Sequence, residues 1–316
     1  MRFKPSDALR FLTGLAAAFA VLAFVALRVT SCAPVPHPVP TLTAAAAPIP
    51  PPPPVPTPPP ARAAIECAAG PLAAAQANAV SMGALAWAPF RRPEVGWEVY
   101  APLFAREVRT ACPPQSPGFA RALAAWEARQ GLPAQGVFND ADFTRFKGLT
   151  QTRRTFVMLS VQGVCPPPPA EATLETSRPD EGYGAKQVLL RPAALAAWRA
   201  MVAAARAEDP QIAADPRNLT LFSGYRSPDA DAARCAAEGN CDGVIRATCS
   251  PHRTGLAIDL YVGQAPGYGP DSSADPNRLF MIRTPAYRWL VANADRFGFT
   301  PYPFEPWHWE WTGEAP

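Results

Sequence analysis

The hydrophobic pattern before residue 170 is helical. Phe119, Leu123 and Trp126 recur at the spacing of one helical face, which predicts an amphipathic helix. Asn139 and Asp140 are both residues that can cap a helix, and a second short apolar helix is predicted after them. Together with the composition of the flanking segments, this pattern predicts a small, mainly helical domain over residues 62–170.

From about residue 176 the pattern changes to alternating helices and strands. Leu195, Trp198, Met201 and Val202 fit a helix, and NLTLFSGYRS fits a strand that ends in a turn. Near the C-terminus, tryptophans alternate with polar residues in WHWEW, which is typical of a strand. This change of pattern predicts a second domain over residues 176–316.

One predicted strand carries an acidic residue in an unfavourable place. In SPHRTGLAIDLYVG, residues 250–263, aliphatic side chains alternate with Ala257, Asp259 and Tyr261. This period of two predicts a half-buried strand with Asp259 on the face opposite the aliphatic residues. A carboxylate in such a strand costs free energy unless a cation or several hydrogen-bond donors meet it.

Length and charge narrow the choice of function. The chain has 316 residues, which suits about two domains. Its formal net charge of +3 comes without a basic stripe interleaved with aromatic residues, so nucleic acid is not an expected partner. The 41 prolines and seven cysteines are unevenly distributed, and their positions are more informative about domain organisation than the net charge is.

Residues 1–32 have the features of a targeting segment. Basic residues precede residues 11–27, a stretch of 17 residues without a charge, intermediate between a signal peptide and a full membrane span. The following VTSC resembles a lipoprotein cleavage motif in which Cys32 would receive lipid. A lipid anchor and an uncleaved membrane anchor both remain open. Either predicts a membrane-tethered protein of the cell envelope, with its catalytic part in the periplasm or otherwise outside the cytoplasm.

Residues 33–61 form a proline-rich linker. Fourteen prolines in this stretch favour extended polyproline II over a helix or a central strand. Such a spacer would carry the following domains away from the membrane and into the cell-wall layer.

The cysteines indicate disulfides in an exported protein. Apart from Cys32 there are six, an even number, and no pair has the two-residue spacing of a zinc knuckle. Cys235 and Cys241 flank the short AAEGN turn and are the favoured pair. Three of the six precede residue 170 and three follow it, so complete pairing requires at least one bridge between the two parts.

The C-terminal part contains the residues of a catalytic zinc site. His252, Asp259 and His308 supply the three His/Asp ligands that such a site needs beside one open position. Zn²⁺ would also balance the charge of Asp259. Glu305, three residues before His308, is a carboxylate that can accept a proton from the attacking water. Arg226 in SGYRS would stabilise a developing oxyanion or a substrate carboxylate.

These motifs resemble a known family. SPHRTGLAID is similar to the Ser-x-His-x-x-Gly-x-Ala-x-Asp signature of the VanY-type zinc D-alanyl-D-alanine carboxypeptidases and the related dipeptidases, and EPWHWEW to their Glu-x-x-His element. The resemblance covers residues 176–316. It implies an α+β fold with a central antiparallel sheet and flanking helices, zinc on the three ligands, Glu305 as the base, and substrate contacts from Arg226 and Ser250.

A shorter resemblance concerns residues 118–147. The apolar helix, the Gly131-Leu132 pair, Gly136 and the second helix are similar to the second half of a helical peptidoglycan-binding repeat. A plain helical hairpin has the same pattern, so both interpretations stay open.

We therefore expect an exported zinc metallopeptidase that trims peptidoglycan stem peptides by releasing terminal D-alanine. Among enzymes, the alternative is a peptidoglycan endopeptidase of the same fold, because the insert at residues 235–249 could reshape the substrate pocket. Among proteins without enzymatic activity, the alternative is a cell-wall-binding protein. Loss of Glu305 would favour that alternative, but Glu305 is present.

Overall fold

A computed structural model describes residues 60–237, 239, 241 and 249–316, all of which belong to one compact unit, Thr57–Pro316. The predicted targeting segment with Cys32, nearly all of the predicted linker and most of the 235–249 insert lie outside the described residues. Within the described residues, no helix combines the length and apolar character needed to cross a membrane. The division into domains at 62–170 and 176–316 stays a prediction.

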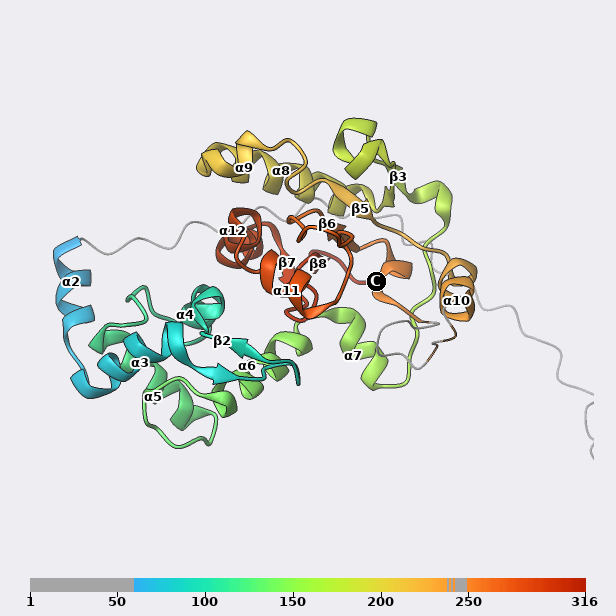
Figure 1. Cartoon of the computed structure of the whole chain (residues 1–316). Coiled ribbons are helices and arrows are strands. Elements are labelled where there is room, and N and C mark those ends of the chain that lie inside the picture. Colours follow the sequence, from blue (N-terminus) through green and yellow to red (C-terminus); the bar gives the residue numbers. More distant parts are fainter. Residues whose placement is uncertain (1–59, 238, 240, 242–248) are drawn as a thin grey trace, which may run out of the picture. The chain divides into compact units, whose positions relative to one another are not determined.

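The first part of the described chain is mainly helical (Figure 1). Its elements are α2 (Pro60–Ala68), α3 (Leu72–Ala84), β1 (Ala86–Trp87), β2 (Glu94–Val95), the 3-10 turn η1 (Glu98–Tyr100), α4 (Ala101–Glu107), α5 (Pro117–Arg129), α6 (Asp140–Thr152) and α7 (Thr155–Val161). Helix α2 begins at Pro60 and so includes the last two residues of the predicted linker, where a proline is well tolerated in a first helical turn.

Helices α5 and α6 match the sequence pattern. Phe119, Leu123 and Trp126 are all buried on one face of α5. The side chain of Asn139 accepts hydrogen bonds from the backbone of α6, so Asn139 is the cap of that helix and Asp140 is its first residue. The predicted pair of helices is therefore present. Neither its helices nor its cap distinguishes a peptidoglycan-binding repeat from a helical hairpin.

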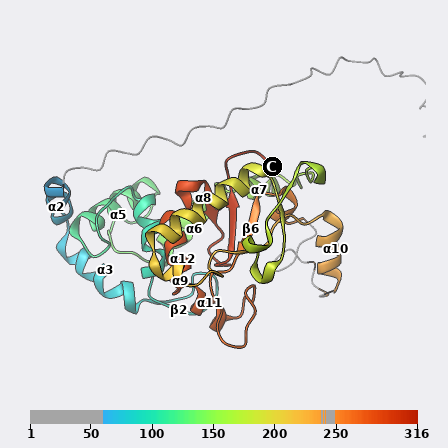
Figure 2. The same ribbon diagram turned by 90° about the horizontal axis from the view of Figure 1, so that it is seen from above.

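The second part combines helices with small antiparallel sheets, an α+β arrangement. Its elements are β3 (Glu175–Thr176), β4 (Leu189–Leu190), α8 (Pro192–Glu208), α9 (Pro210–Ala214), β5 (Leu221–Ser223), α10 (Pro228–Ala237), η5 (Pro251–Thr254), β6 (Ala257–Leu260), α11 (Asp275–Met281), α12 (Pro285–Asn293), η6 (Ala294–Phe297), β7 (Phe299–Pro301) and β8 (His308–Trp311). The central sheet has the order β5-β6-β8-β7, and every neighbouring pair is antiparallel. Helix α8 lies beside this sheet in both views (Figures 1 and 2), and the Trp198 indole on it donates to the backbone oxygen of Leu219.

The prediction that strand β6 is half-buried is wrong, because all four of its residues are buried. Ile258 and Leu260 belong to the hydrophobic core, as the alternation predicts. Asp259 lies on the other face, as expected, but that face is covered as well. Arg154 and Phe156 of the helical part line the same pocket as Asp259.

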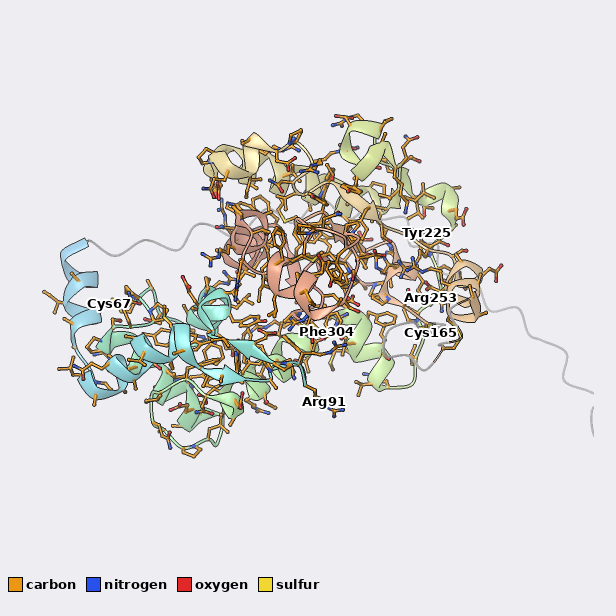
Figure 3. All side chains as sticks on the ribbon, in the orientation of Figure 1. Cys67, Arg91, Cys165, Tyr225, Arg253 and Phe304 are labelled. Atoms are coloured by element: carbon orange, nitrogen blue, oxygen red, sulfur yellow. A yellow bond between two sulfur atoms is a disulfide. The ribbon has the colours of Figure 1, made fainter. Side chains whose placement is uncertain are left out.

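Three disulfides connect described cysteines. The Cys235–Cys241 bridge expected from the spacing is present, and Cys67–Cys112 joins α2 to the segment before α5. Cys165–Cys249 joins the helical part to the second part, as the count of cysteines required. In Figure 3, Cys165 lies next to Arg253, whose guanidinium donates to its sulfur.

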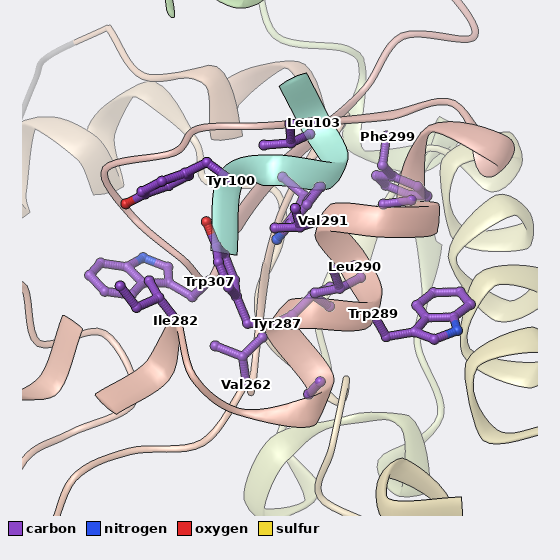
Figure 4. Packing of buried hydrophobic residues seen from close by; sticks show 14 of the residues in the cluster. Tyr100, Leu103, Val262, Ile282, Tyr287, Trp289, Leu290, Val291, Phe299 and Trp307 are labelled. Carbon is purple, nitrogen blue, oxygen red and sulfur yellow. The ribbon is translucent and has the colours of Figure 1, made fainter. Parts of the chain in front are cut away.

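A continuous hydrophobic core runs through both parts. Tyr100 and Leu103, from η1 and α4, lie beside Tyr287, Leu290 and Val291 of α12 in Figure 4, and all belong to one buried cluster. A buried ion pair between strand β2 and helix α11 joins the same two parts. The helical part is thus held against the sheet by packing, by charge and by a covalent bridge, and this fixes its contribution to the site.

Candidate active site

Two of the three predicted metal ligands meet across neighbouring strands. The register of β6 and β8 pairs Asp259 directly with His308, and Oδ1 of Asp259 lies 2.9 Å from Nδ1 of His308. Side chains directly opposite in an antiparallel pair share one face of the sheet. Strand pairing by itself therefore brings these two ligands together.

The third ligand comes from the turn before β6. His252 lies in η5, which ends at Gly255 with φ +71°, a left-handed conformation that favours glycine. Nε2 of His252 lies 3.2 Å from Oδ2 of Asp259, while Nδ1 lies 2.7 Å from the carbonyl oxygen of Gly224. Gly224 itself lies tightly against β4, since a Cβ there would lie 2.7 Å from the backbone oxygen of Leu189.

The arrangement of these residues fits a metal ion. One ligand atom from each of His252, Asp259 and His308 lies within 4.8 Å of the others, and all three residues are buried. A carbonyl can only accept, so Nδ1 of His252 carries the proton and Nε2 presents a lone pair to Asp259. On His308 the outer nitrogen, Nε2, lies 3.1 Å from Oε1 of Glu310, which leaves Nδ1 facing Asp259. Histidines that bind metals usually have such outer hydrogen bonds.

The electrostatics of the cluster also favour a cation. Burial alone would raise the pKa of Asp259, but the two neighbouring histidines outweigh burial and hold it below its usual value. Burial lowers the pKa of His252. His308 is likewise buried, yet its hydrogen bonds to the Asp259 and Glu310 carboxylates raise its pKa to about 9. Two carboxylates thus attract positive charge to this position.

The predicted catalytic residues line the same pocket as the ligands. The pocket has a volume of about 530 Å³ and is lined by side chains that include Arg226, Ser250, His252, Asp259, Glu305 and His308. Glu305 lies in the loop between β7 and β8, where Pro301 pairs with Trp309 and closes the hairpin. The backbone of Glu305 forms a turn there, accepting from His308 N and donating to Tyr302 O. The structure therefore gathers the six predicted residues around one cavity.

Arg226 is held by an acidic residue that the sequence did not single out. Its Nε donates to Asp231 at 2.8 Å, and its other nitrogens donate to Ser223 and Ser250. Ser250 in turn donates to Asp231 at 2.6 Å. A guanidinium has five N–H groups. The three described contacts of Arg226 use three of them, which leaves two N–H groups to donate to a substrate. Asp231 thus fixes both residues that were expected to contact substrate.

Sequence reasoning missed the contribution of the helical part. Four pocket-lining residues lie on or between α6 and α7, namely Gln151, Arg154, Phe156 and Ser160. Their spacing is ordinary for a helix and carries no chemical signal. Glu310 was detectable, because alternation in WHWEW places it on the same face of the strand as His308.

Part of the chain matches a known protein family. Residues 187–314 match the family model of VanY, the D-alanyl-D-alanine carboxypeptidases. These residues form a VanY-family domain. This VanY-family domain contains His252, Asp259, His308, Glu305 and Arg226. The four pocket residues from α6 and α7 all precede the matched region. No curated protein matches the chain.

The solved structures that are similar to part of the chain include two peptidases, LdcB and VanY. The LdcB LD-carboxypeptidase, whose structure concerns peptidoglycan recognition, has 24% identity and a TM-score of 0.27 over 40% of this chain and 60% of that one. The chain thus spans less than two thirds of LdcB. A mutant of the vancomycin-resistance D,D-pentapeptidase VanY, in complex with Zn(II), has 22% identity and a TM-score of 0.27 over 46% of this chain and 83% of that one.

Proposed function

We propose that the protein is a zinc-dependent D-alanyl-D-alanine carboxypeptidase that removes the terminal D-alanine from peptidoglycan stem peptides. The observation that carries the proposal is the buried cluster of His252, Asp259 and His308 in one pocket with Glu305 and Arg226. The match of residues 187–314 to the VanY family supports the reaction class.

The three clustered residues would hold zinc, His252 through Nε2, His308 through Nδ1 and Asp259 through a carboxylate oxygen. Three protein ligands are the number that catalytic zinc sites use. When bound, zinc would polarise the scissile carbonyl and would lower the pKa of the attacking water to about 7. The buried carboxylate of Asp259 would then be balanced by a cation, which removes the cost noted from its sequence position.

Glu305 and Arg226 would carry the remaining chemistry. Glu305 accepts a proton from the attacking water and later returns it to the leaving amine of D-alanine. Arg226, anchored by Asp231, holds a fixed positive charge at the pocket wall, suited to a substrate carboxylate or to the oxyanion formed during attack. Ser250, bonded to Asp231, would orient the substrate beside it.

We further propose that the protein is exported and tethered to the membrane. This localisation rests on the charge-flanked apolar residues 11–27 and on the proline-rich residues 33–61. The three disulfides suit an oxidising compartment. A Cys32→Ala variant tests the mode of attachment. Membrane retention at unchanged size would favour an uncleaved anchor, and release from the membrane would favour a lipid anchor.

Digestion of purified muropeptides, with the products weighed by mass spectrometry, tests the reaction. We expect pentapeptide stems to lose one D-alanine. Cleavage inside the stem peptide or at a cross-link would instead identify an endopeptidase, and loss of D-alanine from tetrapeptides would identify an L,D-carboxypeptidase. If zinc-loaded protein cleaves no muropeptide, the proposed function is wrong.

A further inference from the structure

Arg154 reaches the proposed metal site from outside the VanY-family domain. It lies between α6 and α7, at the position directly before the first residue of α7, and precedes the matched residues 187–314. Its side chain lines the catalytic pocket, although the residue is only 6% exposed. An arginine so deeply buried needs a partner for its charge, since an unpaired buried cation is costly.

That partner is the carboxylate that holds His308. Nε of Arg154 donates to Oε1 of Glu310 at 2.9 Å, and a second guanidinium nitrogen donates to the same oxygen. The same Oε1 lies 3.1 Å from Nε2 of His308. A single carboxylate oxygen thus joins the guanidinium to the outer nitrogen of a predicted metal ligand.

The guanidinium is itself fixed on two other sides. Its Nη1 donates to Gln151, one turn earlier on α6, and its plane lies over the ring of Tyr302 at 4.8 Å from the ring centroid. Tyr302 belongs to the loop that carries Glu305. Because α6, α7 and the β7–β8 loop all contact Arg154, its position relative to Glu310 is determined by the fold.

We propose that Arg154 is a positioning residue for the metal site, acting through Glu310 on His308. With Arg154 present, Glu310 stays where it accepts from Nε2, and Nδ1 of His308 faces Asp259 and His252. Without it, Glu310 loses two donors, and the imidazole is no longer held in one orientation. The helical part would then complete the active site in addition to packing against it. This inference rests on the proposed function.

Zinc affinity of the full chain tests the inference without relying on activity. Zinc is titrated in competition with a chromophoric chelator at one fixed pH. Loss of an outer partner of a ligand typically weakens metal binding about 10- to 100-fold. Since Arg154 acts one step further out, we expect Arg154→Met to weaken zinc binding about 10-fold. Arg154→Lys should recover part of the loss, since an ammonium keeps the charge but not the paired donors.

Arg153→Met is the matched control. Arg153 is the neighbouring residue and also forms an ion pair, with Glu107, but its side chain is 58% exposed and does not line the pocket. The Arg153→Met variant should bind zinc with the affinity of the wild type. If Arg154→Met binds zinc with unchanged affinity, or if Arg153→Met weakens it equally, the inference is wrong.

A double-mutant cycle separates positioning from general packing. If Arg154 acts through Glu310, Arg154→Met should weaken zinc binding no further in a Glu310→Gln background. Losses that add would overturn the inference. Should Arg154→Met fail to fold by circular dichroism, Arg154→Lys replaces it in the cycle, and wild-type affinity in that variant would overturn the inference. A wild-type chain that binds no zinc would instead reject the proposed function as well.

Discussion

Asp259 and His308 lie directly opposite each other on β6 and β8, with Oδ1 and Nδ1 2.9 Å apart, although 49 positions separate them in the chain. The pairing register decides this contact, because side chains alternate between the faces of a strand. A shift of one residue would turn His308 into the hydrophobic core and Trp309 into the pocket. Correct pairing of these two strands is therefore a condition for metal binding.

Replacement of Glu305 should separate chemistry from coordination. Glu305→Gln keeps the size of the side chain but removes the proton acceptor, so we expect hydrolysis to slow by about 10²–10⁴-fold. Zinc content should stay near one per chain, because the three proposed ligands are intact. His308→Ala, measured in parallel, should lose both zinc and activity. Wild-type turnover in Glu305→Gln would reject Glu305 as the base, and loss of zinc would make it a ligand.

Arg226→Lys should impair turnover more than folding. The lysine keeps the charge but cannot reproduce the planar fork that contacts Asp231, Ser223 and Ser250. We expect kcat/KM to fall at least about 10-fold, with a thermal midpoint close to that of the wild type. Arg217→Lys, at an exposed Asp215 ion pair, is the control and should leave kcat/KM unchanged. Near-normal efficiency in Arg226→Lys would show that Arg226 is structural.

The Cys165–Cys249 bridge should stabilise the protein more than the Cys235–Cys241 bridge. The two bridges close loops with sequence separations of 84 and 6 residues. The entropy that a disulfide removes from the unfolded chain grows with loop length, which corresponds to about 4.6 kcal/mol for the longer loop against about 2.2 kcal/mol for the shorter one. Denaturant unfolding of the two Cys→Ser double variants measures both losses. Equal losses would contradict this explanation.

Asp142 should make stability depend on pH. Burial, together with the neighbouring Glu127 carboxylate, raises the pKa of Asp142 to about 7. Because this folded pKa exceeds the unfolded value of about 3.9, the stabilising contribution is complete below about pH 4 and is lost as the pH rises through 7. The free energy of unfolding should thus fall between pH 4 and 7.

Asp142→Asn should remove this dependence. The amide oxygen can still accept from the backbone of Asn139, as the carboxylate does at 3.0 Å. The variant should therefore gain stability relative to the wild type as the pH increases, measured by denaturant unfolding at several pH values. A stability difference that is constant from pH 4 to 8 would contradict the assignment.

The amino-acid sequence by itself determined the local elements and the inner residues of the candidate site. Periodicity located the helix with Leu195 and Trp198 and the strand with Asp259, because local side-chain patterns follow helix and strand geometry. Short motifs with characteristic spacing identified His252, Asp259 and His308. Such residues are recognisable because metal chemistry restricts which side chains can serve as ligands.

Only the tertiary structure decided what surrounds those residues. The contact of Arg154 with Glu310 spans 156 positions and depends on how α6 and α7 pack against the sheet. All four residues of β6 are buried in the folded chain, whereas the alternation predicted a half-buried strand. Outer hydrogen bonds and pocket walls can be supplied by many residue types from any adjacent element. Their positions therefore follow from packing, and no local sequence pattern records them.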